Sequence, residues 1–183
     1  MTTPINEWAG RMSAEQSRQW PIIAEICHRT DAVSALEGLI VIGSFATGDV
    51  DDLSDIDLIA VAAPDCFDDA WEKRTRLRAE NTLVAWDSHA APSCRAHKWL
   101  TPDLVKVECV IVDPAAGGMK LADPCAVLMG DESLIERFPR IPPIPDDALQ
   151  EYAEQIRSDG LVPDVETKYG EMKTAVRRAL ADS

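Results

Sequence analysis

Residues 41–61 read Val-Ile-Gly-Ser-Phe-Ala-Thr-Gly-Asp-Val-Asp-Asp-Leu-Ser-Asp-Ile-Asp-Leu-Ile-Ala-Val, and this segment is the strongest indication of the fold. An apolar run over residues 39–42 ends at Gly43, and a second apolar run opens with Asp55 and Asp57. Short apolar runs bounded in this way are typical of buried strands. Aspartate is a poor strand former, so two aspartates at the start of a strand need a functional reason.

Alternation along a strand puts Asp55 and Asp57 on one face and their apolar neighbours on the other. Alternate Cα atoms lie ~6.6–6.8 Å apart, so the two carboxylates can converge on hard cations. Magnesium takes oxygen ligands and keeps room for substrate phosphates, so the pattern predicts a magnesium site. The alternative is a solvated acidic loop after an ordinary turn at Gly43-Ser44. The position of Asp57 between two apolar residues, where solvation is hardest, favours the metal site.

The order apolar-Gly-Ser, ten further residues, then Asp-apolar-Asp-apolar over residues 42–58 resembles the signature of the nucleotidyltransferases of the DNA polymerase beta superfamily. It looks closest to the small bacterial members, which include antibiotic nucleotidyltransferases and the minimal nucleotidyltransferases of toxin–antitoxin pairs. The resemblance implies an α/β (α+β) fold with a mixed sheet flanked by helices. It also implies that Gly43 and Ser44 hold the triphosphate of a nucleoside triphosphate. Asp55 and Asp57 would bind two Mg²⁺ ions, with Mn²⁺ as an alternative.

Thr47 departs from the family pattern, because many members carry a basic residue there. The absence of a basic residue at position 47 removes a phosphate contact and leaves open whether the site is active. One function is transfer of a nucleoside monophosphate to a hydroxyl of a small molecule or protein, with release of pyrophosphate. The other is a non-catalytic antitoxin or regulatory module that binds a partner protein, such as a toxin.

The family's third acid comes from a later strand beside the Asp-x-Asp strand, and residues 104–112 carry the candidate Glu108. Alternation in this run puts Glu108 and Lys106 on one face, opposite a wholly apolar face. A carboxylate in such a run is costly to bury unless it is paired or bound to metal. The alternative is a solvent-facing pair of Lys106 and Glu108, with Asp103 or Asp113 as the third acid.

The composition bounds the function classes. The chain has 183 residues, 46% of them hydrophobic, and a formal net charge of -14. This apolar share argues against disorder. The negative charge disfavours general nucleic-acid binding, which depends on neutralising phosphates with Lys and Arg, so the acceptor is expected to be a small molecule or a protein. We expect a cytoplasmic protein with no membrane segment, since no apolar run approaches ~18 residues.

The remaining elements follow from periodicity and breakers. Residues up to 38 are expected to be helical, with one helix beginning at Pro21. A long helix is expected over residues 65–85. It carries four basic residues, which we interpret as a solvated face: Lys73, Arg74, Arg76 and Arg78. Alternatively, Arg74 or Arg78 could reach a phosphate. Later elements are strands at 97–100, 104–112 and 127–129, a hairpin turn at 101–103, and a helix at 132–137 capped by Asp131.

The expected domain organisation is a nucleotidyltransferase domain (1–140), a proline-rich connector (141–145) and a C-terminal helical segment (146–183). The five cysteines are scattered, which favours reduced, buried thiols over a disulfide framework. His89, Cys94 and His97 lie close in sequence, but three loosely spaced ligands are weak evidence for zinc. We therefore expect a loop and strand edge there.

Overall fold

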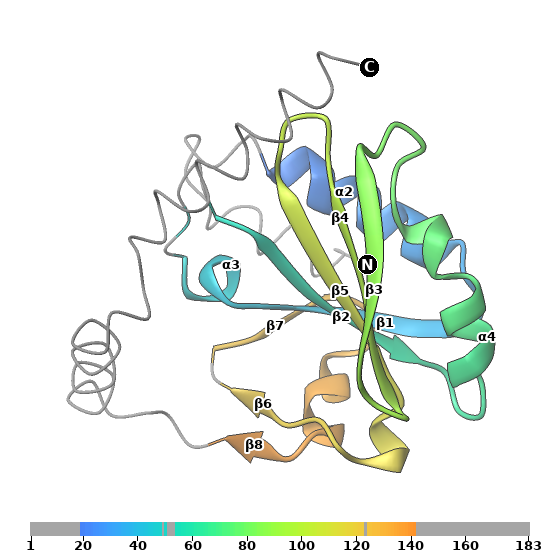
Figure 1. Ribbon diagram of the computed structural model, residues 1–183. Coiled ribbons are helices and arrows are strands. Elements are labelled where there is room, and N and C mark those ends of the chain that lie inside the picture. Colours follow the sequence, from blue (N-terminus) through green and yellow to red (C-terminus); the bar gives the residue numbers. More distant parts are fainter. Residues whose placement is uncertain (1–18, 49, 51–53, 123, 142–183) are drawn as a thin grey trace, which may run out of the picture. The chain divides into compact units, whose positions relative to one another are not determined.

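The computed structural model describes residues 19–48, 50, 54–122 and 124–141 (Figure 1). The chain divides between Ile141 and Pro142, and every described residue belongs to the first part. The connector and the C-terminal helical segment, from Pro142 onward, lie outside the described residues and stay predictions. Among the described residues, no helix is long and apolar enough to cross a membrane.

A mixed sheet forms the centre of the fold, as the sequence predicts (Figure 1). Its six strands lie in the order β3-β4-β5-β2-β1-β7. Strands β2 and β5 pair in parallel, and every other neighbouring pair is antiparallel. The strands are β1 (Leu36–Ile42), β2 (Ile56–Ala62), β3 (Val84–Ala91), β4 (Cys94–Leu100), β5 (Lys106–Val112) and β7 (Ala126–Met129).

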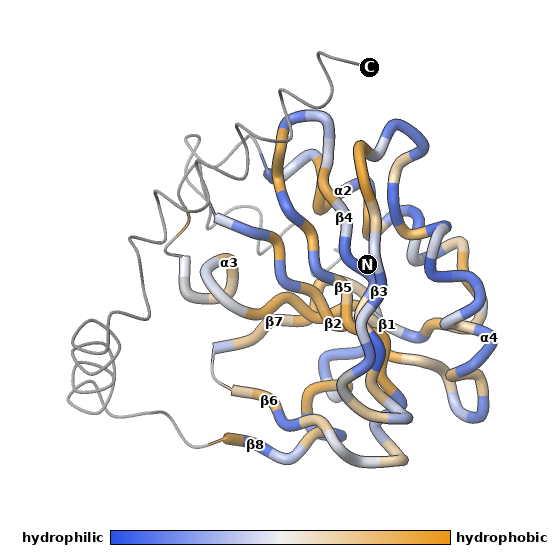
Figure 2. The backbone as a smooth tube through the Cα atoms, in the orientation of Figure 1, coloured by the Kyte–Doolittle hydropathy of each residue, from blue (hydrophilic) through white to orange (hydrophobic). Residues whose placement is uncertain are grey.

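Helices cover one face of this sheet. They are α2 (Trp20–Asp31), α3 (Ser44–Thr47), α4 (Phe67–Glu72) and the 3₁₀ helix η2 (Arg74–Leu77). Pro21 lies in the first turn of α2, as predicted, where its missing N–H costs no helical hydrogen bond. Ile23 of α2 packs in one buried cluster with Leu58 of β2 and Cys109 of β5. Figure 2 shows hydrophobic residues concentrated on the central strands and hydrophilic ones along α4.

Described segments after β5 cover part of the opposite face. A second, two-stranded parallel sheet pairs β6 (Leu121–Ala122) with β8 (Arg140–Ile141), after the 3₁₀ helix η3 (Pro114–Ala116). With the 3₁₀ helix η4 (Glu132–Arg137), these segments bury an apolar group that includes Ile40, Ile59 and Val61. The acids at the start of β2 belong to the same face, beyond this apolar group.

The long helix predicted over residues 65–85 is wrong, because α4 ends at Glu72 and residues 84–91 form β3. β3 pairs with β4 along its length, and this tertiary pairing overrides the local helical preference. β1 begins at Leu36, within the stretch expected to be helical. The hairpin turn at 101–103 joins β4 to β5, as predicted. Asp131 caps η4 by accepting a hydrogen bond from the Ser133 amide at 2.9 Å.

Candidate functional site

Gly43 joins β1 to α3 in a conformation that suits glycine alone. Its φ of 69° and ψ of -151° lie outside the regions open to residues with a side chain. A Cβ at this position would lie 2.9 Å from Oδ2 of Asp57. The turn therefore touches the Asp57 carboxylate only because Gly43 has no side chain. Ser44, the first residue of α3, follows at once and is half-buried.

Asp57 and Glu108 are direct neighbours across the parallel pair of β2 and β5. Their Cα atoms are register partners, although 51 positions separate the two residues in sequence. Residues paired in this way project from the same face of a sheet. On β5 that face is half-exposed at Lys106 and Glu108, whereas Val107 and Cys109 on the other face are buried. The structure thus places Glu108 beside Asp57.

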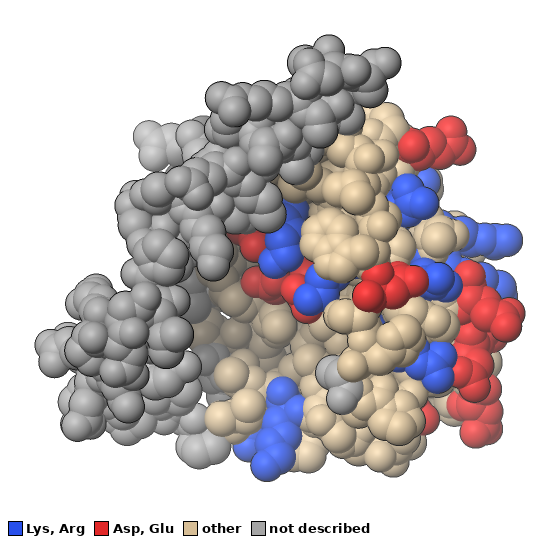
Figure 3. Space-filling model, viewed as in Figure 1, with Lys and Arg blue, Asp and Glu red and all other residues tan. Residues whose placement is uncertain are grey.

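Asp55 lies just before β2 and is tied to the same face by a lysine. The Lys106 ammonium donates a hydrogen bond to Asp55 Oδ2 at 2.9 Å and lies 3.7 Å from Glu108 Oε2. A second lysine, Lys98 of β4, lies 3.0 Å from Glu108 Oε1. These five residues, Asp55, Asp57, Lys98, Lys106 and Glu108, form the acid–lysine cluster. Figure 3 shows acidic and basic side chains in contact near the middle of the visible face.

Asp57 lies between the two outer acids and has an unusual pKa. Burial raises the pKa of its carboxyl group, and the charges of Asp55 and Glu108 raise it further, against the lowering effect of Lys106 and Lys98. Burial is the largest of these causes. For Lys106, burial lowers the pKa, but its hydrogen bond to Asp55 and the surrounding acids outweigh burial and raise it. Lys106 is therefore charged at neutral pH.

The acid–lysine cluster belongs to one row of side chains that crosses five strands. Successive register pairs link Trp86, Lys98, Glu108, Asp57 and Ile42. At one end, on edge strand β3, the Trp86 side chain is 42% exposed. At the other end, Ile42 and Gly43 form a wall of a pocket of about 270 Å³. The charged cluster thus lies between an exposed aromatic ring and an apolar pocket.

This pocket is lined mainly by the segment that follows β5. Its other lining residues are Met119, Lys120, Leu121, Ala122, Pro124 and Ile141. Lys120 is the single charged residue among the lining residues that the structure describes. The pocket therefore suits an uncharged or weakly anionic group placed next to Gly43.

The donor set matches the chemistry of Mg²⁺, which prefers oxygen ligands and tolerates several carboxylates. Asp55, Asp57 and Glu108 supply such oxygens from one face, and Gly43 places no Cβ against the Asp57 carboxylate. As these side chains stand, no group of three His, Cys, Asp or Glu residues within the described ranges is arranged around a common metal position. Oxygens of Asp55 and Glu108 are instead bound to lysine.

The competing acids lie away from Asp57. Asp103 is exposed in the β4–β5 turn and lines a small pocket with residues of α2, on the helical side. Asp113 follows the opposite end of β5, roughly 17 Å along the strand from Glu108 at 3.3 Å per residue. Its carboxylate caps η3 by accepting a hydrogen bond from the Ala115 amide at 2.9 Å. Of these three acids, Glu108 is the register partner of Asp57.

The three candidate zinc ligands do not come together. His97 projects toward the helical face, where its Nδ1 lies 2.7 Å from Asp87 Oδ1, whereas Cys94 packs in the apolar cluster of the opposite face. His89 stacks edge-on against Trp71, with ring centroids 5.3 Å apart. The segment is a strand pair, where a loop and strand edge was expected. All five cysteines are unpaired.

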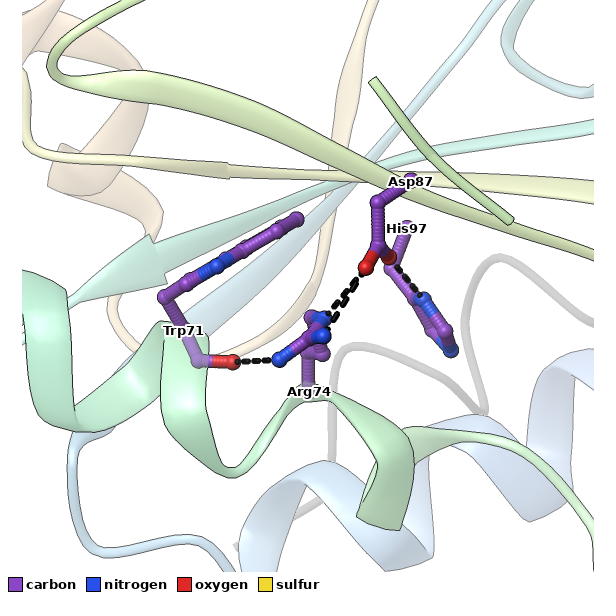
Figure 4. A network of polar contacts seen from close by, with 4 residues as sticks. All are labelled: Trp71, Arg74, Asp87 and His97. Carbon is purple, nitrogen blue, oxygen red and sulfur yellow. Dashed lines mark hydrogen bonds and ion pairs between the residues drawn. The ribbon is translucent and has the colours of Figure 1, made fainter. Parts of the chain in front are cut away.

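A second polar cluster lies on the helical face (Figure 4). Arg74 of η2 donates two hydrogen bonds to Asp87 Oδ2 at 2.8 and 3.0 Å and one to the Trp71 carbonyl at 3.1 Å. Asp87 and His97 are register partners across β3 and β4. We call Trp71, Arg74, Asp87 and His97 the Asp87 cluster. Arg74 is engaged with Asp87 here, on the face opposite the acid–lysine cluster, and the suggestion that it reaches a phosphate stays a prediction.

Hydrogen bonding sets the pKa values in the Asp87 cluster. Burial raises the pKa of Asp87, but hydrogen bonds from Arg74 and His97 outweigh it and hold the pKa below its usual value. Burial lowers the pKa of His97 and outweighs the opposing effect of Asp87. His97 is 3% exposed, and its Nε2 is buried with no hydrogen-bond partner in the part of the chain that the structure describes. The histidine is thus neutral at pH 7.

Sequence reasoning missed Lys98 and undervalued Lys106. For Lys106 the signal was present, because its spacing of two from Glu108 puts both on one face of a strand. For Lys98 no local signal exists, because its contact with Glu108 depends on the register of β4 against β5.

No protein-family model and no curated protein matches this sequence. Structural neighbours are nucleotidyltransferases of the poly(U) polymerase type. They include a cytoplasmic RNA terminal U-transferase, with 14% identity and a TM-score of 0.44 over 59% of this chain and 33% of that one. The Cid1 poly(U) polymerase has 16% identity and a TM-score of 0.43 over 59% of this chain and 34% of that one. A structure of Cid1 with the UTP analog UMPNPP has 16% identity and a TM-score of 0.41 over 60% of this chain and 34% of that one. The chain spans about a third of the length of these proteins. The likeness to small bacterial members stays a prediction.

Proposed function

We propose that this protein transfers a nucleoside monophosphate from a nucleoside triphosphate to a hydroxyl group of a small molecule or protein and releases pyrophosphate. The observation that carries the proposal is the register of Asp57 with Glu108, next to a glycine turn that touches the Asp57 carboxylate. This arrangement brings the sequence motif that contains Gly43 and Asp57 together with Glu108, which lies 51 positions after Asp57. A solvated acidic loop, the alternative interpretation, does not require such a convergence.

Each residue of the site has a distinct role in this proposal. Asp55, Asp57 and Glu108 would hold two Mg²⁺ ions, or Mn²⁺, which together activate the attacking oxygen and neutralise charge on the triphosphate. Gly43 lets the backbone approach the triphosphate closely, and Ser44 offers a hydroxyl beside it. Glu108, whose side chain is partly exposed, accepts the proton of the acceptor hydroxyl. The acceptor oxygen bonds to the α-phosphorus as the bond to pyrophosphate breaks.

The acceptor class follows from charge and from the pocket beside Gly43. A net charge of -14 opposes the binding of polyanionic nucleic acid. When the phosphates lie at Gly43, an uncharged part of a substrate can reach the pocket lined by Ile42, Met119 and Leu121. These features favour a small-molecule or protein acceptor.

A non-catalytic nucleotidyltransferase-like module that binds a partner protein is the second candidate. Lys106 and Lys98 favour it, because their ammonium groups compensate Asp55 and Glu108 without any added cation. Thr47, in place of a basic residue, points the same way. In this case the acids have a structural role and no catalytic one.

Binding of a nucleotide distinguishes the two candidates before any acceptor is known. We expect calorimetry to show that the wild-type protein binds a non-hydrolysable nucleoside triphosphate in the presence of Mg²⁺, and that Asp57→Asn does not. Label transfer from α-labelled triphosphates to candidate hydroxyl compounds then tests catalysis. A wild-type protein that binds no triphosphate with Mg²⁺ or Mn²⁺ would rule out the enzyme and leave the binding module.

A further inference from the structure

The acid–lysine cluster contains its own cations. Lys106 bridges two of the three acids, with Nζ at 2.9 Å from Asp55 Oδ2 and 3.7 Å from Glu108 Oε2. Among the described residues, Lys98 forms one ion pair, with Glu108 at 3.0 Å. Lys106 is therefore the cation that contacts both outer acids.

We propose that the Lys106 ammonium is an exchangeable counter-ion, which binds Asp55 and Glu108 when no divalent cation is present and must leave them before one can bind. This inference rests on the proposed function, because it concerns cations at the same three acids. The reason is steric and electrostatic. Magnesium binds carboxylate oxygen at ~2.0–2.1 Å, so an ion on Asp55 Oδ2 would lie next to an ammonium that uses the same oxygen.

The position of Lys106 allows this exchange without a change in the sheet. Its side chain is 24% exposed, and its flexible stem can carry the charge into solvent while β5 keeps its register. In the ion-free protein the ammonium also limits repulsion among Asp55, Asp57 and Glu108. Lys106 is thus a positioning residue that sets how tightly the site binds cations.

Two consequences separate this role from a plain surface ion pair. Neutralising Lys106 lowers the stability of the ion-free protein, because the three acids lose their shared counter-charge. The same change raises cation affinity, because the ion no longer competes with an ammonium. A nearby opposite charge changes the proton affinity of a carboxylate by roughly ten- to a thousandfold, so we expect an effect of at least about tenfold on Mn²⁺ affinity.

The test is calorimetric titration of Mn²⁺ alone into the wild-type protein, Lys106→Met and Lys73→Met. Lys73 is the matched control, because it pairs with Asp69 at 2.6 Å on α4 and its loss changes the net charge equally. We expect Lys106→Met to bind Mn²⁺ at least about tenfold tighter than wild type, and Lys73→Met to bind like wild type. Lys106→Gln provides a second neutral variant if Lys106→Met does not fold.

Three results would overturn the inference and are distinguishable. Equal affinities in wild type and the Lys106 variants would show that Lys106 does not compete, while the proposed metal site would stand. Absence of Mn²⁺ binding from wild type and from every folded variant would remove the proposed metal site as well. Equal tightening by Lys73→Met would reduce the effect to net charge.

Discussion

The two polar clusters on opposite faces of the sheet both combine acidic and basic side chains, but they shift the pKa values of their central acids in opposite directions. In the Asp87 cluster, hydrogen bonds from Arg74 and His97 hold the pKa of Asp87 below its usual value. In the acid–lysine cluster, burial and two neighbouring acids raise the pKa of Asp57. The surroundings of Asp87 thus stabilise its anion, whereas those of Asp57 disfavour its anion.

The difference separates a structural acid from a candidate functional one. The lowered pKa of Asp87 contributes stability at neutral pH, and this contribution is lost as pH falls through the folded-state pKa. The raised pKa of Asp57 has the opposite sign, because the anion opposes folding at neutral pH and protonation relieves it. An acid that destabilises the ion-free fold is expected where a bound cation restores the balance.

The largest effect should come from Asp57→Asn. We expect nucleotidyl transfer to fall more than about a hundredfold, because the central ligand of both ions is lost. Without metal, the melting temperature should equal or exceed that of wild type, since a neutral amide avoids the cost of the buried anion. A marked loss of metal-free stability would instead make Asp57 a structural acid like Asp87.

Glu108→Gln should lower turnover about a hundredfold or more while nucleotide binding is kept, because proton acceptance matters only in the transition state. Asp103→Asn and Asp113→Asn are the controls and should leave turnover within about twofold. Pyrophosphate release by the three variants is the measurement. An equal loss in all three would show that net charge, and no particular acid, governs activity.

Gly43→Ala and Gly48→Ala form a matched pair, because both glycines have positive φ (69° and 83°). A Cβ at Gly43 would meet Asp57 Oδ2 at 2.9 Å, whereas at Gly48 it would meet nothing within 4 Å. We expect backbone strain of roughly 1–2 kcal/mol at the left-handed Gly48, greater strain at Gly43, and weaker triphosphate binding in Gly43→Ala alone. Chemical denaturation and calorimetry test this, and equal nucleotide affinity would move the phosphate site elsewhere.

Asp87→Asn should cost about 1 kcal/mol at pH 7, because the cluster is partly exposed and loses charged hydrogen bonds to Arg74 and His97. This difference from wild type should shrink as pH falls below about 4, where the unfolded chain begins to protonate this carboxyl, and should be lost as pH falls through the lower folded-state pKa of Asp87. Denaturation at several pH values measures it. A difference that grows with acidity would contradict the lowered pKa of Asp87.

The smallest effect concerns nucleic acid, for which we expect no appreciable affinity. The net charge of -14 gives duplex DNA or bulk RNA few cations to neutralise. Gel shifts at physiological salt and submicromolar protein test this expectation. A clear shift would revive an RNA or DNA acceptor.

The sequence predicted the central sheet because β1, β2 and β5 are apolar runs bounded by clear breakers. Glu108 was identifiable as a candidate because a carboxylate within an apolar strand is unusual. The strand β3 was missed because Trp71, Leu77 and Leu83 suggested a helix through residue 85, although residues 84–91 pair with β4, the strand that directly follows. The choice between helix and strand there depends on tertiary pairing.

The composition of both polar clusters was beyond sequence reasoning for the same cause. Asp87 meets His97, and Lys98 meets Glu108, only through strand register. A slip of one residue would turn each side chain to the other face, so no local pattern specifies these contacts. The roles assigned to Asp55, Asp57 and Glu108 stay predictions.

A crystal structure with Mn²⁺ and a non-hydrolysable nucleoside triphosphate would show whether the three acids form a metal-dependent nucleotide site. Anomalous scattering locates the ions without assumptions about their ligands. We predict Mn²⁺ bound by Asp55, Asp57 and Glu108, with the triphosphate against Gly43 and Ser44. Ions and triphosphate bound elsewhere, with Lys106 still paired to Asp55 in the complex, would contradict it.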